Sequence, residues 1–206
     1  MFFEFLYWTV GRLIKWIFRL QPEGLENLPK HGALLCPNHA SDWDPVLIGV
    51  CLPHNYHLRI MAKEALFHNK ALAWLIRKLG AFPVTRGTAD IQSVKTAMQV
   101  IKDGQNLLIF PEGTTIRNGL GYVDGLPPHA HSGIAVIGVR SGATLVPVFA
   151  DGPKKPFHKH RIIFGKPYTP VYTGRRGTSE EMQKIADDIL REAYALGGQK
   201  VGGEPL

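Results

Sequence analysis

The stretch Ala33–Pro45, ALLCPNHASDWDP, decides how this chain folds. Its first five residues are mostly apolar and are typical of a short buried strand. His39 and Asp44 follow, five residues apart. On a continuous helix these two side chains would lie about 140° apart around the axis, so they can meet only across a turn. Asp44 and Pro45 suit the cap and the first position of a helix, which indicates a turn between the strand and that helix.

A histidine with a carboxylate partner at the exit of a buried strand has the parts of a general base. Imidazole accepts a proton near neutral pH, and a carboxylate at its other ring nitrogen fixes the tautomer. The same spacing also arises by chance, with the aspartate acting only as a helix cap. The pair therefore needs support from another part of the chain.

A second segment, Asn106–Thr115 (NLLIFPEGTT), supplies that support. It is another apolar run that ends in a carboxylate, Glu112, and the next residue, Gly113, lets the backbone approach a ligand. In parallel α/β sheets, ligands bind beyond the carboxyl ends of the strands. We therefore expect His39, Asp44 and Glu112 to converge on one crevice.

Strands and helices alternate along the rest of the chain, which predicts an α/β fold with a mostly parallel sheet flanked by helices. Strands are expected at 33–37, 58–62, 81–84, 107–110, 144–149 and 161–164, and helices at 45–51, 63–67, 71–79, 89–102, 132–140 and from a capping box at 178 to just before 197. Residues 21–32 are expected to form a polar connector, and residues 113–128 a Gly- and Pro-rich loop.

The composition fits one globular domain of 206 residues with a sizeable core. Cys36 and Cys51 lie on or near apolar segments, so buried free thiols and a reducing compartment are expected. The sequence contains no Cys-x-x-Cys or His-x-x-x-His pattern, and His129 and His131 have no third partner. No metal site is therefore expected.

The formal net charge of +7 fits a nucleic acid, an anionic membrane or an acidic small substrate. Residues 2–20 favour the membrane, because Glu4, Arg12, Lys15 and Arg19 fall within about an 80° arc of a predicted helix and form a narrow, mainly basic stripe. The rest of that helix is aromatic and aliphatic, which suits the membrane interface. A transmembrane span, a signal peptide and a soluble core helix are the alternatives. The sequence has no basic-aromatic RNA-binding pattern, so no nucleic-acid partner is expected.

Four ordered blocks resemble those of the glycerolipid acyltransferases, the family typified by 1-acylglycerol-3-phosphate acyltransferase (lysophosphatidic acid acyltransferase). They are an Asn-His-x4-Asp (HX4D) block at 38–44, Gly-x-hydrophobic-x3-Arg at 80–86, Phe-Pro-Glu-Gly-Thr at 110–114 and a Val-Pro-Val strand at 146–148. All four occur in the family's order, over about residues 25–150. The chain departs from the third block at Thr115, where the family usually has Arg; the nearest arginine is Arg117.

The resemblance implies transfer of a fatty acyl group to the sn-2 hydroxyl of lysophosphatidic acid, which gives phosphatidic acid in phospholipid biosynthesis. The donor would be acyl-CoA or acyl-ACP (acyl carrier protein), with no bound cofactor. His39 would act as the general base and Asp44 would orient it. Direct transfer of this kind requires no enzyme nucleophile.

The resemblance also implies substrate-binding residues. Arg86, and after it Arg117, would bind the phosphate of the acceptor. Glu112 would hydrogen bond the glycerol hydroxyls or position Arg86, and backbone amides around Gly113 and Thr114 would stabilise the oxyanion.

The expected organisation has three parts: a membrane-associating helix at 1–22, an acyltransferase domain at 23–196 and a disordered tail at 197–206. The expected location is the cytoplasmic face of the cell membrane, with peripheral or monotopic attachment to an anionic surface. Three other functions remain open. The acceptor could be glycerol 3-phosphate or another lysophospholipid, the base could activate water for thioester hydrolysis, or the chain could be a non-catalytic lipid-binding protein.

Overall fold

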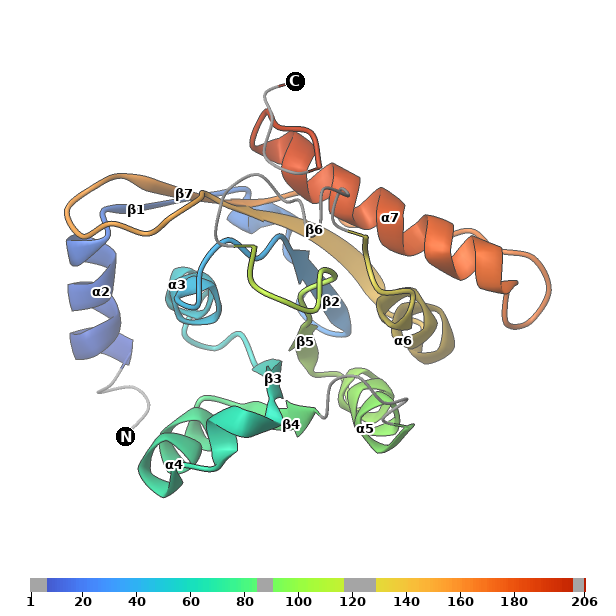
Figure 1. The fold of residues 1–206 in the computed structure, drawn as a ribbon, viewed down its shortest axis with the longest axis horizontal. Coiled ribbons are helices and arrows are strands. Elements are labelled where there is room, and N and C mark those ends of the chain that lie inside the picture. The colour runs from blue at the N-terminus through green and yellow to red at the C-terminus, as the bar shows by residue number, and fades with distance from the viewer. Residues whose placement is uncertain (1–6, 85–90, 117–128, 202–205) are drawn as a thin grey trace.

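The computed structural model describes residues 7–84, 91–116, 129–201 and 206. Its centre is a seven-stranded sheet in the order β1-β7-β6-β2-β5-β3-β4 (Figure 1). The strands are β1 (Leu20–Glu23), β2 (Ala33–Pro37), β3 (Leu58–Lys63), β4 (Ala81–Val84), β5 (Asn106–Leu108), β6 (Thr144–Ala150) and β7 (His160–Phe164). The pair β6–β7 is antiparallel and the other pairs are parallel. The predicted α/β fold with a mostly parallel sheet is confirmed.

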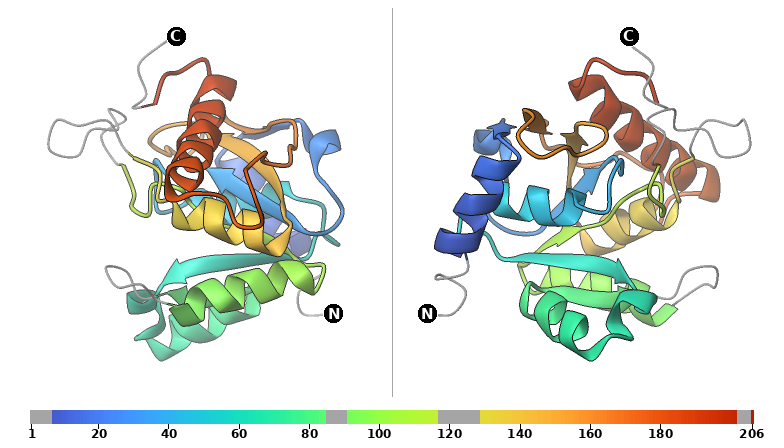
Figure 2. Two further views of the ribbon diagram at one scale, coloured as in Figure 1. Left: turned by 90° about the vertical axis from the view of Figure 1, so that its right-hand side faces the viewer. Right: turned by 60° about the vertical axis from the view of Figure 1, so that its left-hand side comes forward.

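Helices cover both faces of this sheet (Figures 1 and 2). The helical elements are η1 (Tyr7–Gly11), α2 (Arg12–Ile17), η2 (Leu25–Asn27), α3 (Asp44–Cys51), η3 (Glu64–Phe67), α4 (Lys70–Lys78), α5 (Ile91–Lys102), α6 (Gly133–Ser141) and α7 (Ser179–Leu196). The predicted capping box at the start of α7 is present: Thr178 and Glu181 each accept a hydrogen bond from the other's backbone amide.

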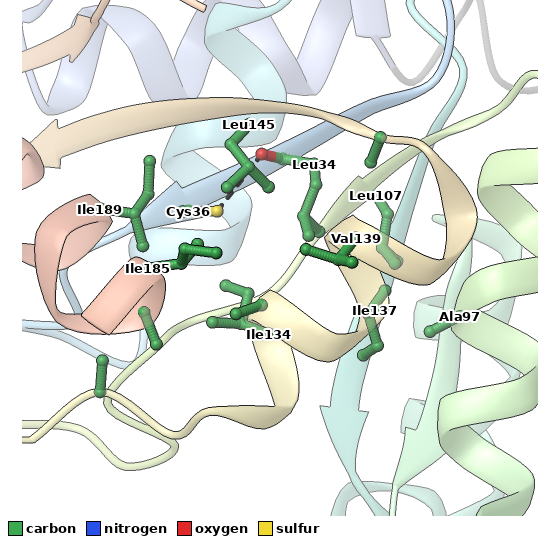
Figure 3. Packing of buried hydrophobic residues seen from close by; sticks show 14 of the residues in the cluster. Leu34, Cys36, Ala97, Leu107, Ile134, Ile137, Val139, Leu145, Ile185 and Ile189 are labelled. Carbon is green, nitrogen blue, oxygen red and sulfur yellow. Dashed lines mark hydrogen bonds between the residues drawn. The ribbon is translucent and has the colours of Figure 1, made fainter. Parts of the chain in front are cut away.

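The central strand β2 is buried along its whole length. Its alternate side chains face opposite sides of the sheet, as the pleat of a strand requires. Leu34 and Cys36 pack with α5, α6 and α7 (Figure 3), whereas Ala33 and Leu35 pack with α3. Burial on both faces explains why this strand is an almost continuous apolar run.

The two cysteines are free and buried, as expected. Burial raises the pKa of Cys51 to about 12, so its thiol stays protonated near neutral pH. Within the described ranges, no helix combines the length and apolar character needed to cross a membrane.

The N-terminal region differs from the single helix predicted for residues 2–20. Residues 1–6 lie outside the described residues, and helical structure from Tyr7 ends at Ile17. Arg19 then adopts a φ of 41°, which turns the chain into β1 at the edge of the sheet. An edge strand tolerates Pro22, which has no amide proton to donate. The first residues of the expected polar connector are therefore a strand, and the expected boundary at residue 22 falls inside β1.

The C-terminal end also differs from prediction. Residues 197–201 were expected to be disordered, but Gln199 donates its amide proton to the carbonyl of Tyr194, and Val201 packs against the core. Residues 202–205 lie outside the described residues.

Candidate active site

Asn38 fixes the point at which β2 ends. Its side-chain amide donates to the carbonyl oxygen of Ala150 at 3.0 Å, and its side-chain oxygen accepts from the amide of Ala150 at 2.8 Å. The side chain thus replaces a backbone pair and continues the contact between β2 and β6. The next residue, His39, therefore leaves the sheet at a fixed position.

The structure brings His39 and Asp44 together across the predicted turn. The Nδ1 atom of His39 lies 3.1 Å from Oδ2 of Asp44, whose side chain is fully buried. The same oxygen accepts the amide proton of Ser41 at 2.7 Å. Asp44 is the first residue of α3 rather than the cap before it, and its carboxylate turns back toward His39. A proton on Nδ1 therefore points at Asp44 and leaves Nε2 to accept another.

The segment after β5 holds His39 on three sides. Its amide donates to Oε2 of Glu112 at 2.7 Å, and its carbonyl accepts from the amide of Ile116 at 2.7 Å. The ring of Phe110 stacks on the imidazole, with 3.9 Å between ring centroids. His39 is 7% exposed. The two segments singled out in the sequence therefore meet around one imidazole.

Glu112 has partners within the protein for both carboxylate oxygens. Besides the amide of His39, it accepts the hydroxyl proton of Tyr194 on α7 at 2.6 Å, and it is 4% exposed. Burial raises the pKa of Glu112 to about 7, against the opposite effect of these two donors. These contacts tie Glu112 to the backbone of His39 and to α7, and its expected roles, hydrogen bonding the glycerol hydroxyls or positioning Arg86, stay predictions.

The expected oxyanion donor at Gly113 is also engaged. Its amide donates to the carbonyl of Phe110 at 3.1 Å, which closes a tight turn. The turn needs glycine, because φ is +64° and a Cβ atom here would lie 2.5 Å from the ring of His131. Thr114 is exposed beside this turn.

Lys154 was not expected from the sequence. Its fully buried side chain places Nζ 3.2 Å from Oδ1 of Asp44. Nζ also donates to the carbonyl oxygens of Asp151 and Gly152 in the loop after β6. Oδ1 of Asp44 has no hydrogen bond among the described residues, so the ion pair is what compensates its charge. In the sequence, Lys154 stands next to Lys155 in a polar loop, and nothing in that loop predicts that the side chain of Lys154 is buried.

Thr115 occupies the remaining side of the imidazole. Its Oγ1 atom lies 3.1 Å from Nε2 of His39 and donates to Oδ1 of Asp42 at 3.0 Å. Thr115 is partly exposed and Asp42 is exposed, so this is the open side of the site. The departure from the family's third block therefore lies directly against the candidate base.

Two predicted phosphate-binding residues, Arg86 and Arg117, lie outside the described residues, and their roles stay predictions. Among the residues that the structure describes, no group of three or more His, Cys, Asp or Glu side chains is arranged to hold a metal ion. At the site itself, the imidazole of His39 has a carboxylate at Nδ1 and a hydroxyl at Nε2.

Comparison with known proteins gives a consistent result. Residues 19–151 match the family model described as Acyltransferase. A 1-acyl-sn-glycerol-3-phosphate acyltransferase from Bacillus subtilis is 34% identical over 149 residues, which are 69% of this chain and 70% of that protein. A protein of the same name from Streptococcus pneumoniae is 28% identical over 178 residues, which are 84% of this chain and 62% of that protein.

A solved structure supports the fold. The crystal structure of a 1-acyl-sn-glycerophosphate (LPA) acyltransferase from Thermotoga maritima superposes with a TM-score of 0.67 at 23% sequence identity. The match covers 96% of this chain and 80% of that one.

Replacing Lys154 tests the buried ion pair. Lys154→Met should lower the free energy of unfolding by about 3 kcal/mol, because it leaves the charge of Asp44 buried without its cation. Urea denaturation measures this, and Lys155→Met, on an exposed neighbour, should change little. Asp44→Asn combined with Lys154→Met should recover part of the loss. Equal stability of wild type and Lys154→Met would contradict the pairing.

The raised pKa of Glu112 predicts a pH-dependent stability. The folded protein binds a proton there up to about pH 7, whereas the unfolded chain releases it near 4.5. Wild-type stability should therefore fall, relative to Glu112→Gln, as pH rises through this window, by at most about 3 kcal/mol. Urea titrations at pH 4.5, 6 and 8 measure the difference. Glu180→Gln, on an exposed carboxylate, is the control; parallel curves for wild type and Glu112→Gln would refute the assignment.

Proposed function

The chain belongs to the acyltransferase family, and on that premise we propose that it transfers a fatty acyl group from a thioester to the sn-2 hydroxyl of lysophosphatidic acid. The product would be phosphatidic acid. The observation that carries the proposal is the buried contact of 3.1 Å between His39 Nδ1 and Asp44 Oδ2, which leaves Nε2 directed at a hydroxyl. The two relatives named as 1-acyl-sn-glycerol-3-phosphate acyltransferases support the choice of acceptor.

An alcohol is a weak nucleophile at neutral pH and needs a base within hydrogen-bond distance. Nε2 of His39 removes the proton of the acceptor hydroxyl as its oxygen attacks the acyl carbonyl. Asp44 stabilises the imidazolium that forms, and Lys154 balances the charge on Asp44. The leaving thiolate, from CoA or acyl carrier protein, takes the proton from His39. This sequence requires no bound cofactor.

The acceptor carries a phosphate, which needs cations for binding. We assign this role to Arg86 and Arg117, as the sequence resemblance implies. Glu112 has another task in this proposal, because a carboxylate next to a phosphate would be repulsive. Glu112 accepts a 2.7 Å hydrogen bond from the backbone amide of His39 and so fixes the position of the base relative to the substrate.

We further propose peripheral attachment to the cytoplasmic face of an anionic membrane. Four of the large apolar side chains that are at least half exposed lie on α2, just before α3 and in the loop after β6, and are named here the aromatic surface: Leu13 (53%), Trp16 (67%), Trp43 (50%) and Phe157 (60%). Trp16 contacts Phe157 edge to face, with 5.8 Å between ring centroids, and Trp43 contacts the buried ring of Phe18. The exposed cations Arg12, Arg19, Lys155 and Lys159 lie on the same segments. Apolar insertion with basic flanks favours anionic lipid.

His39→Ala tests the reaction and the base together. Wild type should form phosphatidate from lysophosphatidate and an acyl thioester, and the variant should lose at least about 100-fold in rate, since general-base catalysis contributes about that much. Product is measured by chromatography of extracted lipid. His129→Ala, on an exposed histidine, is the control. Near-normal turnover by His39→Ala would contradict the general-base role. Turnover by wild type only with glycerol 3-phosphate or with another lysophospholipid would show that the proposed acceptor is wrong.

Trp16→Ala combined with Phe157→Ala tests the aromatic surface. The double variant should bind vesicles containing phosphatidylglycerol several-fold more weakly than wild type, because it loses most of the exposed aromatic area beside α2. Cosedimentation measures binding. Trp74→Ala removes a tryptophan of similar exposure, 55%, from α4 and is the matched control. If Trp74→Ala weakened vesicle binding as much as the double variant does, membrane binding would not be confined to α2 and the loop that contains Phe157.

A further inference from the structure

We propose that Tyr194 on α7 is a positioning residue for the acyl transfer, which acts on the base His39 through Glu112; the inference rests on the proposed function. The hydroxyl of Tyr194 donates to Oε1 of Glu112 at 2.6 Å. Oε2 of the same carboxylate accepts the amide proton of His39 at 2.7 Å. One carboxylate therefore connects α7 directly to the backbone of the base.

This connection is buried along its whole length. Tyr194 and Glu112 are each 4% exposed, and His39 is 7% exposed. Water has little access to either hydrogen bond, so a lost partner is not replaced by solvent. A hydrogen bond to an ionised carboxylate is also stronger than one between neutral groups, and more so in a site of low dielectric constant. The two bonds therefore transmit the position of α7 to the base.

The place of the hydroxyl follows from the end of α7. The carbonyl of Tyr194 accepts the amide protons of Gly197 at 3.0 Å and Gln199 at 3.1 Å, which closes the last turn of the helix. Gly197 packs against the ring of Phe149 in β6, where a Cβ atom would lie 2.2 Å from the ring. The end of α7 is thus held on the sheet, and the phenol ring enters the site from a fixed backbone.

The sequence resemblance gives Tyr194 no role. The segment that matches the family model ends at residue 151, and α7 begins at Ser179. Tyr194 lies on the buried face of α7 with Ile189 and Leu190, and a tyrosine among such residues indicates core packing. Its hydrogen bond to Glu112 distinguishes it from these apolar neighbours.

The charge state of Glu112 depends on groups from several segments. Burial raises the pKa of Glu112 to about 7. The hydroxyl of Tyr194 and the amide of His39 act in the opposite direction, because both donate to the carboxylate, whereas the charge on Asp44 makes a small contribution in the same direction as burial. The exposed ring of His131 lies against the backbone of the residue after Glu112.

Loss of the hydroxyl therefore has a defined consequence for the base. Without the donor on Tyr194, the pKa of Glu112 should rise further, and more of the protein should carry a neutral carboxyl near pH 7. A neutral carboxyl accepts the amide proton of His39 less strongly than a carboxylate does. Tyr194 thus favours the charged acceptor that holds the backbone of the base.

Tyr194→Phe keeps the ring and removes the hydroxyl. With lysophosphatidate and an acyl thioester, kcat near pH 7 should fall about 10-fold, the change expected for loss of one hydrogen bond to a charged group. KM for the acceptor should change little, because the buried Tyr194 acts only through Glu112. Part of the loss should be recovered at higher pH, where Glu112 is ionised in the variant as well. Tyr168→Phe is the matched control, since the buried hydroxyl of Tyr168 has no hydrogen-bond partner among the described residues.

A spectroscopic measurement tests the connection without turnover. Protein labelled with 15N at the backbone nitrogen of histidine gives amide signals only from its 9 histidines, and the signal missing from His39→Gln belongs to His39. In wild type this signal should shift as Glu112 ionises near pH 7, and in Tyr194→Phe the midpoint should move to higher pH. In Glu112→Gln the shift caused by Glu112 should be absent, with or without the hydroxyl of Tyr194.

The outcomes separate this inference from the proposed function. An unchanged kcat in Tyr194→Phe, or the same midpoint as in wild type, would overturn the role of Tyr194 and leave the proposed transfer standing. An equal loss of kcat in Tyr168→Phe would also overturn it, because removal of any buried hydroxyl would then have the same effect. If wild type formed no phosphatidate, the proposed function would be wrong, and the amide titration would decide by itself whether Tyr194 acts on His39 through Glu112.

Discussion

The hydrogen bond from the amide of His39 to Glu112 is the contact on which the site depends. It joins the end of β2 to the segment after β5 at 2.7 Å, and Tyr194 extends the connection to α7. The carbonyl of His39 is bonded to Ile116 of the same segment. The imidazole is therefore positioned by backbone contacts to a neighbouring strand end, which is a more rigid support than side-chain packing alone.

The site holds two buried carboxylates close to one imidazole, and the protein compensates them differently. Asp44 is paired with the buried ammonium of Lys154, so its negative charge is available to stabilise an imidazolium. Glu112 has no such cation among the described residues, and burial, with a smaller contribution from the charge on Asp44, raises its pKa to about 7. The division fits the roles proposed above: Asp44 would stabilise charge on the imidazole, and Glu112 holds the backbone of His39.

Local sequence was sufficient for β2, the turn and the start of α3, because an apolar run, a proline and a five-residue spacing act within thirteen residues. The missed features come from contacts between distant segments. Lys154 reaches Asp44 from 110 positions away, and the loop around it has the composition of a solvated surface. β1 was missed because a polar, proline-containing edge strand forms only when β7 lies beside it.

The side chain at position 115 sets the charge directly beside Nε2 of His39. An arginine there would bring a permanent cation next to Nε2 of His39, where it would oppose the imidazolium and attract an anionic substrate. A threonine brings a neutral hydroxyl, which accepts from the protonated base and donates to the free one. Phosphate binding, which we propose for Arg86 and Arg117, would then rely on cations at other positions of the chain. Thr115 thus keeps a neutral polar group beside Nε2, where an arginine would place a permanent positive charge.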